Sequence, residues 1–373
     1  MQNCSYKIII FLLWGVIAGI AYGGALDPTR VGMGARAIAL GRSQAAARDL
    51  FSTFVNPANA SALEHYGFTS MYGTLAEDSP YTLIGAGFPI REGTLGTVGV
   101  SFLSLGVSGI QVTTFDATGR AQPLSSFDYN NRLLTVSYGK EINPRAALGA
   151  SLKYFSRAFE GQASASGFDL DAGILYYPQK NLTLGLALQN LLPVDWANLA
   201  WAKTREDIPL NLKMGLVFTP REDWLLIGDY DSAGGIHAGA EWVVRKFLAL
   251  RGGMENLPSG KSSTVTNYSL GVGLRYAGFN FDYAYYLDSL ISANSSHFFS
   301  LSLELPFKTM ETPAILPARA PSQEVAPLTQ VQKKTVVITK KKAKTPPPKK
   351  KVAAKKNIKK KTALPELTRY SRR

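Results

Sequence analysis

Residues 299–307 read FSLSLELPF, and up to residue 305 the odd positions are Phe or Leu while the even positions are Ser or Glu. Successive side chains of a β-strand point to opposite faces, so this stretch predicts a strand with one apolar and one polar face. The same alternation recurs at 168–176, 182–189, 210–218 and 279–285. The body of the chain is therefore predicted to be all-β.

The two faces of these strands carry different kinds of side chain. The polar faces hold charged or very small residues, which is typical of the lumen of a membrane barrel, and the apolar faces hold Tyr or Phe near strand ends, which is typical of an aromatic girdle at a bilayer interface. The lumen candidates are Lys153, Asp169, Asp171, Lys213, Arg275 and Asp282. The girdle candidates are Tyr138, Tyr154, Tyr176, Phe218 and Tyr276. A water-soluble all-β protein is the alternative, and it would need a second sheet to cover each apolar face.

The segments between the predicted strands alternate in length. Short ones fall near 91–93, 143–145, 178–180, 220–222, 245–246 and 277–278, and longer ones cover about 106–127, 158–166, 192–207, 256–265 and 287–296. Outer-membrane barrels have short periplasmic turns, longer extracellular loops and an even number of antiparallel strands. We therefore predict an all-β, about 14-stranded antiparallel transmembrane β-barrel over residues 66–307, in the bacterial outer membrane, with both chain termini in the periplasm.

The two ends of the chain differ from its body. Lys7, an apolar stretch at 8–20 and small residues at 23–25 predict a signal peptide over residues 1–25. The formal net charge of +14 comes from the other end, where residues 332–373 hold 14 Lys and 3 Arg against one Glu. The Pro- and Lys-rich segment 308–373 is predicted to be a disordered basic tail in the periplasm. Because the chain is exported, we expect the tail to bind anionic cell-wall polymers or lipid headgroups, and no nucleic acid.

Residues 26–65 show no strand-like alternation and are rich in Ala and Gly. The stretch GMGARA at 32–37 matches the G-x-G-x-x-A pattern of dinucleotide sites, but no predicted strand precedes it and no β-α-β unit follows, so the match is rejected. Asn56 followed by Pro57 is a helix-start pattern, since the Asn side chain can accept hydrogen bonds from the first free amides and Pro suits the first helical position. We predict a compact segment ahead of the barrel.

The run TRVGMGARAIALG at 29–41, Asp49 and the Asn-Pro-Ala element at 56–58, followed by about fourteen strands, resembles the PorV/PorQ family, which is itself similar to FadL-type fatty-acid transporters. The resemblance implies that residues 26–65 fold into the lumen as a hatch, with the Asn-Pro-Ala element near its periplasmic end. The hatch residues that it implicates in ligand binding or gating are Gly34, Arg36, Gly41, Asn56, Pro57 and Ala58.

Three functions follow as hypotheses. The resemblance implies passage or binding of small hydrophobic molecules such as long-chain fatty acids, with those molecules and outer-membrane lipids as partners. The alternative is an outer-membrane scaffold or shuttle of a type IX-like protein secretion pathway, with secretion-system proteins as partners. The third is a lipid-modifying barrel enzyme using His297 after Ser295 and Ser296.

Neighbouring Ser and His residues do not supply the orienting acid that a catalytic pair needs, so we predict no enzyme. No metal-ligand spacing is present either, and we expect no metal and no cofactor.

Overall fold

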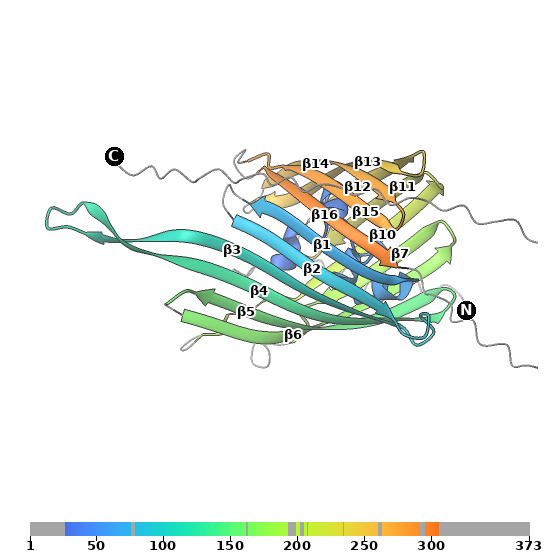
Figure 1. Cartoon of the computed structure of the whole chain (residues 1–373), viewed down its shortest axis with the longest axis horizontal. Coiled ribbons are helices and arrows are strands. Elements are labelled where there is room, and N and C mark those ends of the chain that lie inside the picture. The colour runs from blue at the N-terminus through green and yellow to red at the C-terminus, as the bar shows by residue number, and fades with distance from the viewer. Residues whose placement is uncertain are drawn as a thin grey trace, which may run out of the picture. The chain divides into compact units, whose positions relative to one another are not determined.

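The computed structural model (Figure 1) describes residues 27–75, 79–161, 163–192, 199–201, 205–206, 208–233, 235–259, 263–290 and 295–305. The predicted signal peptide and basic tail lie outside these residues. Within the described part, no helix is long and apolar enough to cross a membrane.

Fourteen long antiparallel strands close into a barrel. They are β1 (Tyr66–Leu75), β2 (Ser79–Pro89), β3 (Thr97–Phe115), β4 (Ala121–Asn143), β5 (Ala146–Phe159), β6 (Ala163–Gln179), β7 (Leu182–Gln189), β10 (Asn211–Arg221), β11 (Trp224–Asp231), β12 (Ile236–Val244), β13 (Leu248–Ser259), β14 (Ser263–Tyr276), β15 (Phe279–Leu287) and β16 (Ser296–Leu305). Each strand pairs with its neighbour in the chain, β7 pairs with β10, and β1 pairs with β16 to close the ring. Two short strands, β8 (Leu199–Ala200) and β9 (Arg205–Glu206), form a hairpin beside β6. The predicted strand number is confirmed.

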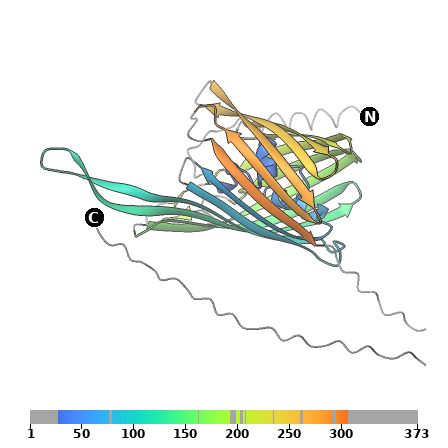
Figure 2. The ribbon, with the colours of Figure 1, turned by 45° about the horizontal axis from the view of Figure 1, so that its top comes forward.

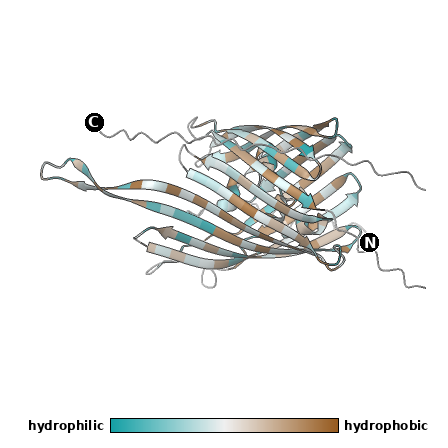
Figure 3. Ribbon diagram, viewed as in Figure 1, coloured by the Kyte–Doolittle hydropathy of each residue, from teal (hydrophilic) through white to brown (hydrophobic). Residues whose placement is uncertain are grey.

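The apolar faces of the strands point outward, as the alternation predicts. On β16, Phe299 and Leu301 are 44% and 45% exposed, while Ser300 between them is buried against the lumen. Along the strands in Figure 3, hydrophobic (brown) segments are interleaved with white and hydrophilic (teal) ones. Exposed aromatic side chains also gather where the strands meet the short turns: Tyr66, Phe88, Tyr138, Tyr176, Phe218, Trp224, Trp242 and Tyr276. An apolar outer band edged by aromatic rings is the outer surface of a barrel that lies in a membrane.

The prediction of long loops is wrong at several places. Most of 106–127 belongs to β3 and β4, which continue beyond the barrel as a two-stranded arm (Figures 1 and 2). Its tip is a tight turn in which Asp116 Oδ1 accepts hydrogen bonds from the amides of Thr118 (2.8 Å) and Arg120 (2.9 Å). Segments 158–166 and 256–265 are likewise mostly strand. Their Ser, Thr and Gly residues look like loop residues, yet pairing with the neighbouring strand satisfies their backbone groups.

Residues 27–65 fold inside the barrel, where Figure 2 shows their short helices within the ring of strands. They form η1 (Pro28–Val31), α2 (Ala35–Ala39), η2 (Phe51–Phe54) and η3 (Pro57–Ala62). Most of their side chains are buried. We call this segment the hatch, and it fills the middle of the lumen.

Candidate functional site: the lumen and its hatch

The Asn-Pro-Ala element anchors the hatch to the barrel wall. Asn56 Oδ1 accepts a hydrogen bond from the amide of Ala58 (3.1 Å), and Pro57 occupies the first position of η3, so the predicted helix start is present. The Asn56 side-chain amide donates to the carbonyl of Ala45 (2.6 Å) and reaches the carbonyl of Ile174 on β6 (3.5 Å). Ala58 is fully buried against β5. One side chain therefore joins two hatch segments and the wall.

Inward-facing glycines receive the hatch backbone around much of the barrel. We call these residues the glycine belt: Gly139, Gly149, Gly173, Gly185, Gly215, Gly239, Gly253 and Gly271. A Cβ built on any of them would lie within 3.0 Å of a hatch atom, closer than real Cβ contacts. On Gly239, for instance, it would lie 2.6 Å from the Leu40 carbonyl oxygen. The belt lets two backbones touch where side chains would hold them apart.

Two of the predicted hatch glycines have backbone conformations that L-residues rarely adopt. Gly34 has φ +100° and precedes α2, where an added Cβ would meet the ring of Phe51. Gly41 has φ +69°, and its added Cβ would lie 2.6 Å from the carbonyl oxygen of Ala238. Both positions require glycine for conformation and for space.

Arg36 belongs to a buried ionic network that includes two of the predicted lumen residues. Its guanidinium binds Asp49 (2.7 Å) and Glu241 on β12 (2.8 Å). Glu241 also binds Arg251 (2.6 Å) and Arg275 (3.1 Å), and Arg251 binds Asp282 (2.7 Å). Burial alone would lower the pKa of Arg36, but the carboxylates of Glu241 and Asp49 outweigh it and raise that pKa. Arg36 is therefore a permanent cation that holds α2 to the wall.

A second network brings together the predicted residues Lys153, Asp169 and Asp171. The Lys153 ammonium binds Asp171 (2.8 Å), lies 3.5 Å from Asp27 Oδ2, and donates to Asn190. Asp27 Oδ1 accepts from the Thr29 amide at the start of η1. Burial alone would raise the pKa of Asp27, but Lys153 and the hydrogen bonds outweigh it and lower that pKa. This network fixes the beginning of the hatch.

A third network was not predicted from the sequence. Arg42, directly after Gly41, binds Glu255 on β13 (2.9 Å), which also accepts from the Tyr286 hydroxyl (2.7 Å). His237 contacts the carbonyl of Gly41 through Nδ1 (2.8 Å) and Asp231 through Nε2 (3.3 Å). The sequence contains one signal for this network, a charged residue at an inward-facing position near a hatch glycine. It does not contain the order in which hatch residues contact the strands.

Two cavities lie in the lumen, one on each side of hatch residues 37–41. The turn-side cavity, about 490 Å³, is lined by Arg36, Asp49, Arg251, Arg275, Asp282 and hatch residues 62–65. The loop-side cavity, about 280 Å³, is lined by Arg42, Lys213, Asp231, His237, Glu255 and hatch residues 29–32. Residues 37–41 separate the two, so the hatch interrupts the lumen between its ends.

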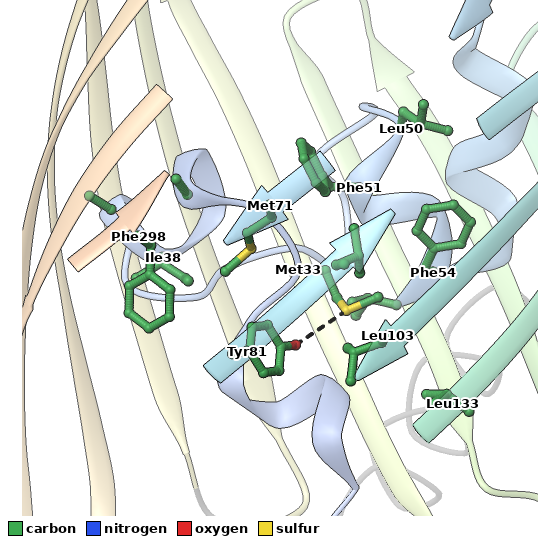
Figure 4. Packing of buried hydrophobic residues seen from close by; sticks show 14 of the residues in the cluster. Met33, Ile38, Leu50, Phe51, Phe54, Met71, Tyr81, Leu103, Leu133 and Phe298 are labelled. Carbon is green, nitrogen blue, oxygen red and sulfur yellow. Dashed lines mark hydrogen bonds between the residues drawn. The ribbon is translucent and has the colours of Figure 1, made fainter. Parts of the chain in front are cut away.

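Part of the inner wall, centred on β1–β3 and continuing onto β4–β6, β15 and β16, is apolar, which differs from the polar lumen that was predicted. Its buried residues are Met71, Tyr81, Leu83, Leu103, Leu133, Phe155, Ala165, Ala284, Tyr286 and Phe298. Hatch residues Met33, Phe51 and Phe54 pack against them, as Figure 4 shows. The Tyr81 hydroxyl donates to the carbonyls of Pro28 and Gly32 (both 3.2 Å) and so satisfies its polar atom within this apolar layer.

The residue on which the enzyme hypothesis depended faces away from the lumen. His297 is exposed on β16, where its Nδ1 lies 2.8 Å from the Tyr283 hydroxyl and its ring packs on Tyr285. Neither contact is a carboxylate that would orient the ring as a base. Among the described residues, no group of three or more His, Cys, Asp or Glu side chains could hold a metal ion.

Neither a family model nor a curated protein matches the sequence. Solved structures do match. The CymD monoaromatic hydrocarbon channel has a TM-score of 0.57 and 12% identity over 76% of this chain and 100% of its own. The P. putida toluene transporter TodX gives 0.56 and 12% over 74% and 99%, and a Pseudomonas aeruginosa FadL homologue gives 0.51 and 12% over 75% and 99%. At this identity, the likeness shows that the chain has the barrel fold of these proteins.

Proposed function

We propose that the chain is an outer-membrane barrel that binds and passes small hydrophobic molecules, long-chain fatty acids among them. The observation that carries the proposal is the apolar part of the inner wall, centred on β1–β3. Barrels that conduct water and ions have polar interiors, whereas a buried Leu, Phe and Tyr surface beside a hatch suits an apolar ligand. Two proteins of similar fold are a monoaromatic hydrocarbon channel and a toluene transporter, which supports the same class of ligand.

The hatch contacts favour a route along the apolar side. At five of the belt glycines the nearest hatch atoms are backbone, so side-chain movement cannot open a gap there; these are Gly139, Gly149, Gly185, Gly239 and Gly253. On the apolar side, the contacts are made by side chains such as Phe54 against Gly85 and Leu50 against Gly67. Side chains change rotamer within nanoseconds when space allows, whereas packed backbone does not. A ligand is therefore expected to pass between the hatch and β1–β3.

A matched pair on β4 tests the proposal. Leu133 faces the lumen and is 1% exposed, whereas its neighbour Leu134 faces outward and is 41% exposed. With full-length protein purified in mild detergent, we expect Leu133→Thr to weaken binding of radiolabelled hexadecanoate or toluene about tenfold through lost apolar contact, and Leu134→Thr to leave it unchanged. Equal binding by the two variants, or no binding by the unmodified protein, would overturn the proposal.

The remaining partner and placement predictions belong to the same proposal. In the proposed orientation, the short turns face the periplasm, as in other outer-membrane barrels. The ligand or gating role of the six hatch residues, the tail's anionic partner and the secretion-scaffold alternative stay predictions. The observations that favour transport, an apolar lumen wall and channel-like neighbours, lend the secretion alternative no support.

A further inference from the structure

The turn between β12 and β13 carries two cations in a backbone conformation that L-residues rarely adopt. Arg245 has φ +50° and Lys246 has φ +64°, so both are left-handed. Hairpins that need two successive left-handed residues favour Asn-Gly or Asp-Gly, because a Cβ is unfavourable in that conformation. The turn between β14 and β15 follows this preference at its second position, with Ala277 at +49° and Gly278 at +84°. The β12–β13 turn therefore combines a strained backbone with two basic side chains.

These two cations have no use within the described part of the chain. Arg245 and Lys246 are both exposed. Neither side chain makes a hydrogen bond or an ion pair with another described residue, and this includes the acids of the adjacent turn, Glu222 and Asp223. A strained turn whose side chains make no internal contact points to a contact outside the chain.

The aromatic girdle fixes the height of this turn in a bilayer. Trp242 on β12 faces outward and stacks on Trp224 of β11, with ring centroids 5.8 Å apart and planes at 13°. Outward tryptophans near strand ends lie at the boundary between hydrocarbon and headgroups. Arg245 follows Trp242 by three residues, which is about 10 Å along a strand. Because the headgroup layer is about 5–8 Å thick and barrel strands are tilted, both cations lie among the headgroups.

We propose that Arg245 and Lys246 bind the phosphate of an anionic phospholipid whose acyl chains lie against Trp224 and Trp242. A guanidinium binds phosphate through paired hydrogen bonds, and an ammonium adds a point charge beside it. Phosphatidylcholine carries its own cation next to the phosphate, so the site favours a lipid such as phosphatidylglycerol. In the proposed orientation, this lipid belongs to the periplasmic leaflet. The proposal concerns the lipid around the barrel and does not rest on the transport function.

Quenching of tryptophan fluorescence by brominated lipid measures which phospholipid lies beside this turn. Full-length protein is reconstituted in phosphatidylcholine vesicles that contain increasing fractions of phosphatidylglycerol with brominated acyl chains, and a parallel series uses brominated phosphatidylcholine. Bromine quenches tryptophans that it contacts, and Trp224 and Trp242 are exposed on the outer face next to the turn. We expect half of the maximal quenching at a mole fraction about threefold lower for phosphatidylglycerol, since each basic residue at a membrane surface attracts anionic lipid.

Variants separate the two charges from the fold of the turn. Arg245→Asn combined with Lys246→Gly places preferred residues at both left-handed positions, so the turn still forms while its charge is lost. This double variant should be quenched equally by the two brominated lipids. Arg245→Lys combined with Lys246→Arg keeps both charges and should keep the preference. Arg120→Gln removes a cation from the tip of the arm, at the other end of the strands, and should also keep it. Heat-dependent gel migration shows that each variant is folded.

Two results would overturn the proposal. The first is equal quenching of the unmodified protein by the two brominated lipids. The second is a preference for phosphatidylglycerol that persists after both cations of the turn are replaced, which would assign the preference to other basic residues of the barrel.

Discussion

Replacement of Gly253 by alanine tests whether the glycine belt holds the hatch by backbone contact. A Cβ at this position of β13 would lie 2.5 Å from the carbonyl carbon of Leu40 and 2.8 Å from the carbonyl oxygen of Ala39. Ordinary van der Waals contact begins near 3.4 Å, so the hatch has to move by about 1 Å. Because the obstructing atoms are backbone, no rotamer change relieves the overlap. Overpacking of this kind costs about 1–3 kcal/mol.

The adjacent glycine is the control. Gly252 faces outward, and its added Cβ would have Leu270 Cδ2 as its nearest neighbour at 3.8 Å. Gly252→Ala therefore adds one methyl group to the same strand without touching the hatch. We expect urea unfolding in detergent, followed by tryptophan fluorescence, to show the loss for Gly253→Ala only.

Limited proteolysis gives an independent measure of hatch seating. Trypsin should cleave after Arg42 in folded Gly253→Ala faster than in Gly252→Ala, because Arg42 directly follows the displaced segment. If the two variants are equally stable and equally resistant, the hatch does not rest on the belt as described, and the reasoning is refuted.

Three further predictions concern charge. Glu241→Gln should lower the free energy of unfolding by about 3–5 kcal/mol, because it leaves three guanidinium groups around a neutral amide. Arg36→Gln should lower it by less. Urea titration of the two variants measures both losses. The pKa of Asp27 is below its ordinary 3.8, so the stability that its carboxylate contributes is complete above that pH and is lost as pH falls through the lowered pKa. Asp27→Asn should therefore flatten the curve of stability against pH below pH 3.8. An unchanged curve would contradict this. Leu134→Arg on the outer face should cost about 2–4 kcal/mol in lipid bilayers and Tyr276→Arg, at a strand end, about 0–1 kcal/mol, whereas equal costs would argue against the membrane position of this face.

Local patterns were enough to predict the barrel. At 299–305 the polar and apolar positions alternate without interruption, and the exposed and buried faces of β16 follow them as far as Leu301. Asn56 and Pro57 predicted a helix start because the cap is made within three residues. In both cases the determining interactions lie within a few residues, so the sequence contains them directly.

The arm at 106–127 and the apolar part of the inner wall were not predictable in this way. The arm's Gly and Pro residues have weak strand preference, and they lie in strands because β3 and β4 pair beyond the barrel. On β2, Tyr81 and Leu83 face inward while Ile84 and Phe88 face outward. Both faces are apolar there, so hydropathy could not tell the lumen side from the membrane side.

The sequence by itself determined which residues alternate, how many strands form and where the hatch begins a helix, because these depend on neighbours along the chain. Only the tertiary structure decided that Arg36 binds Glu241, 205 residues away, and that the hatch backbone lies on the glycine belt. Barrel closure brings strands into contact with one folded hatch at a particular height and rotation. That placement depends on all the strands together, so no local pattern encodes it.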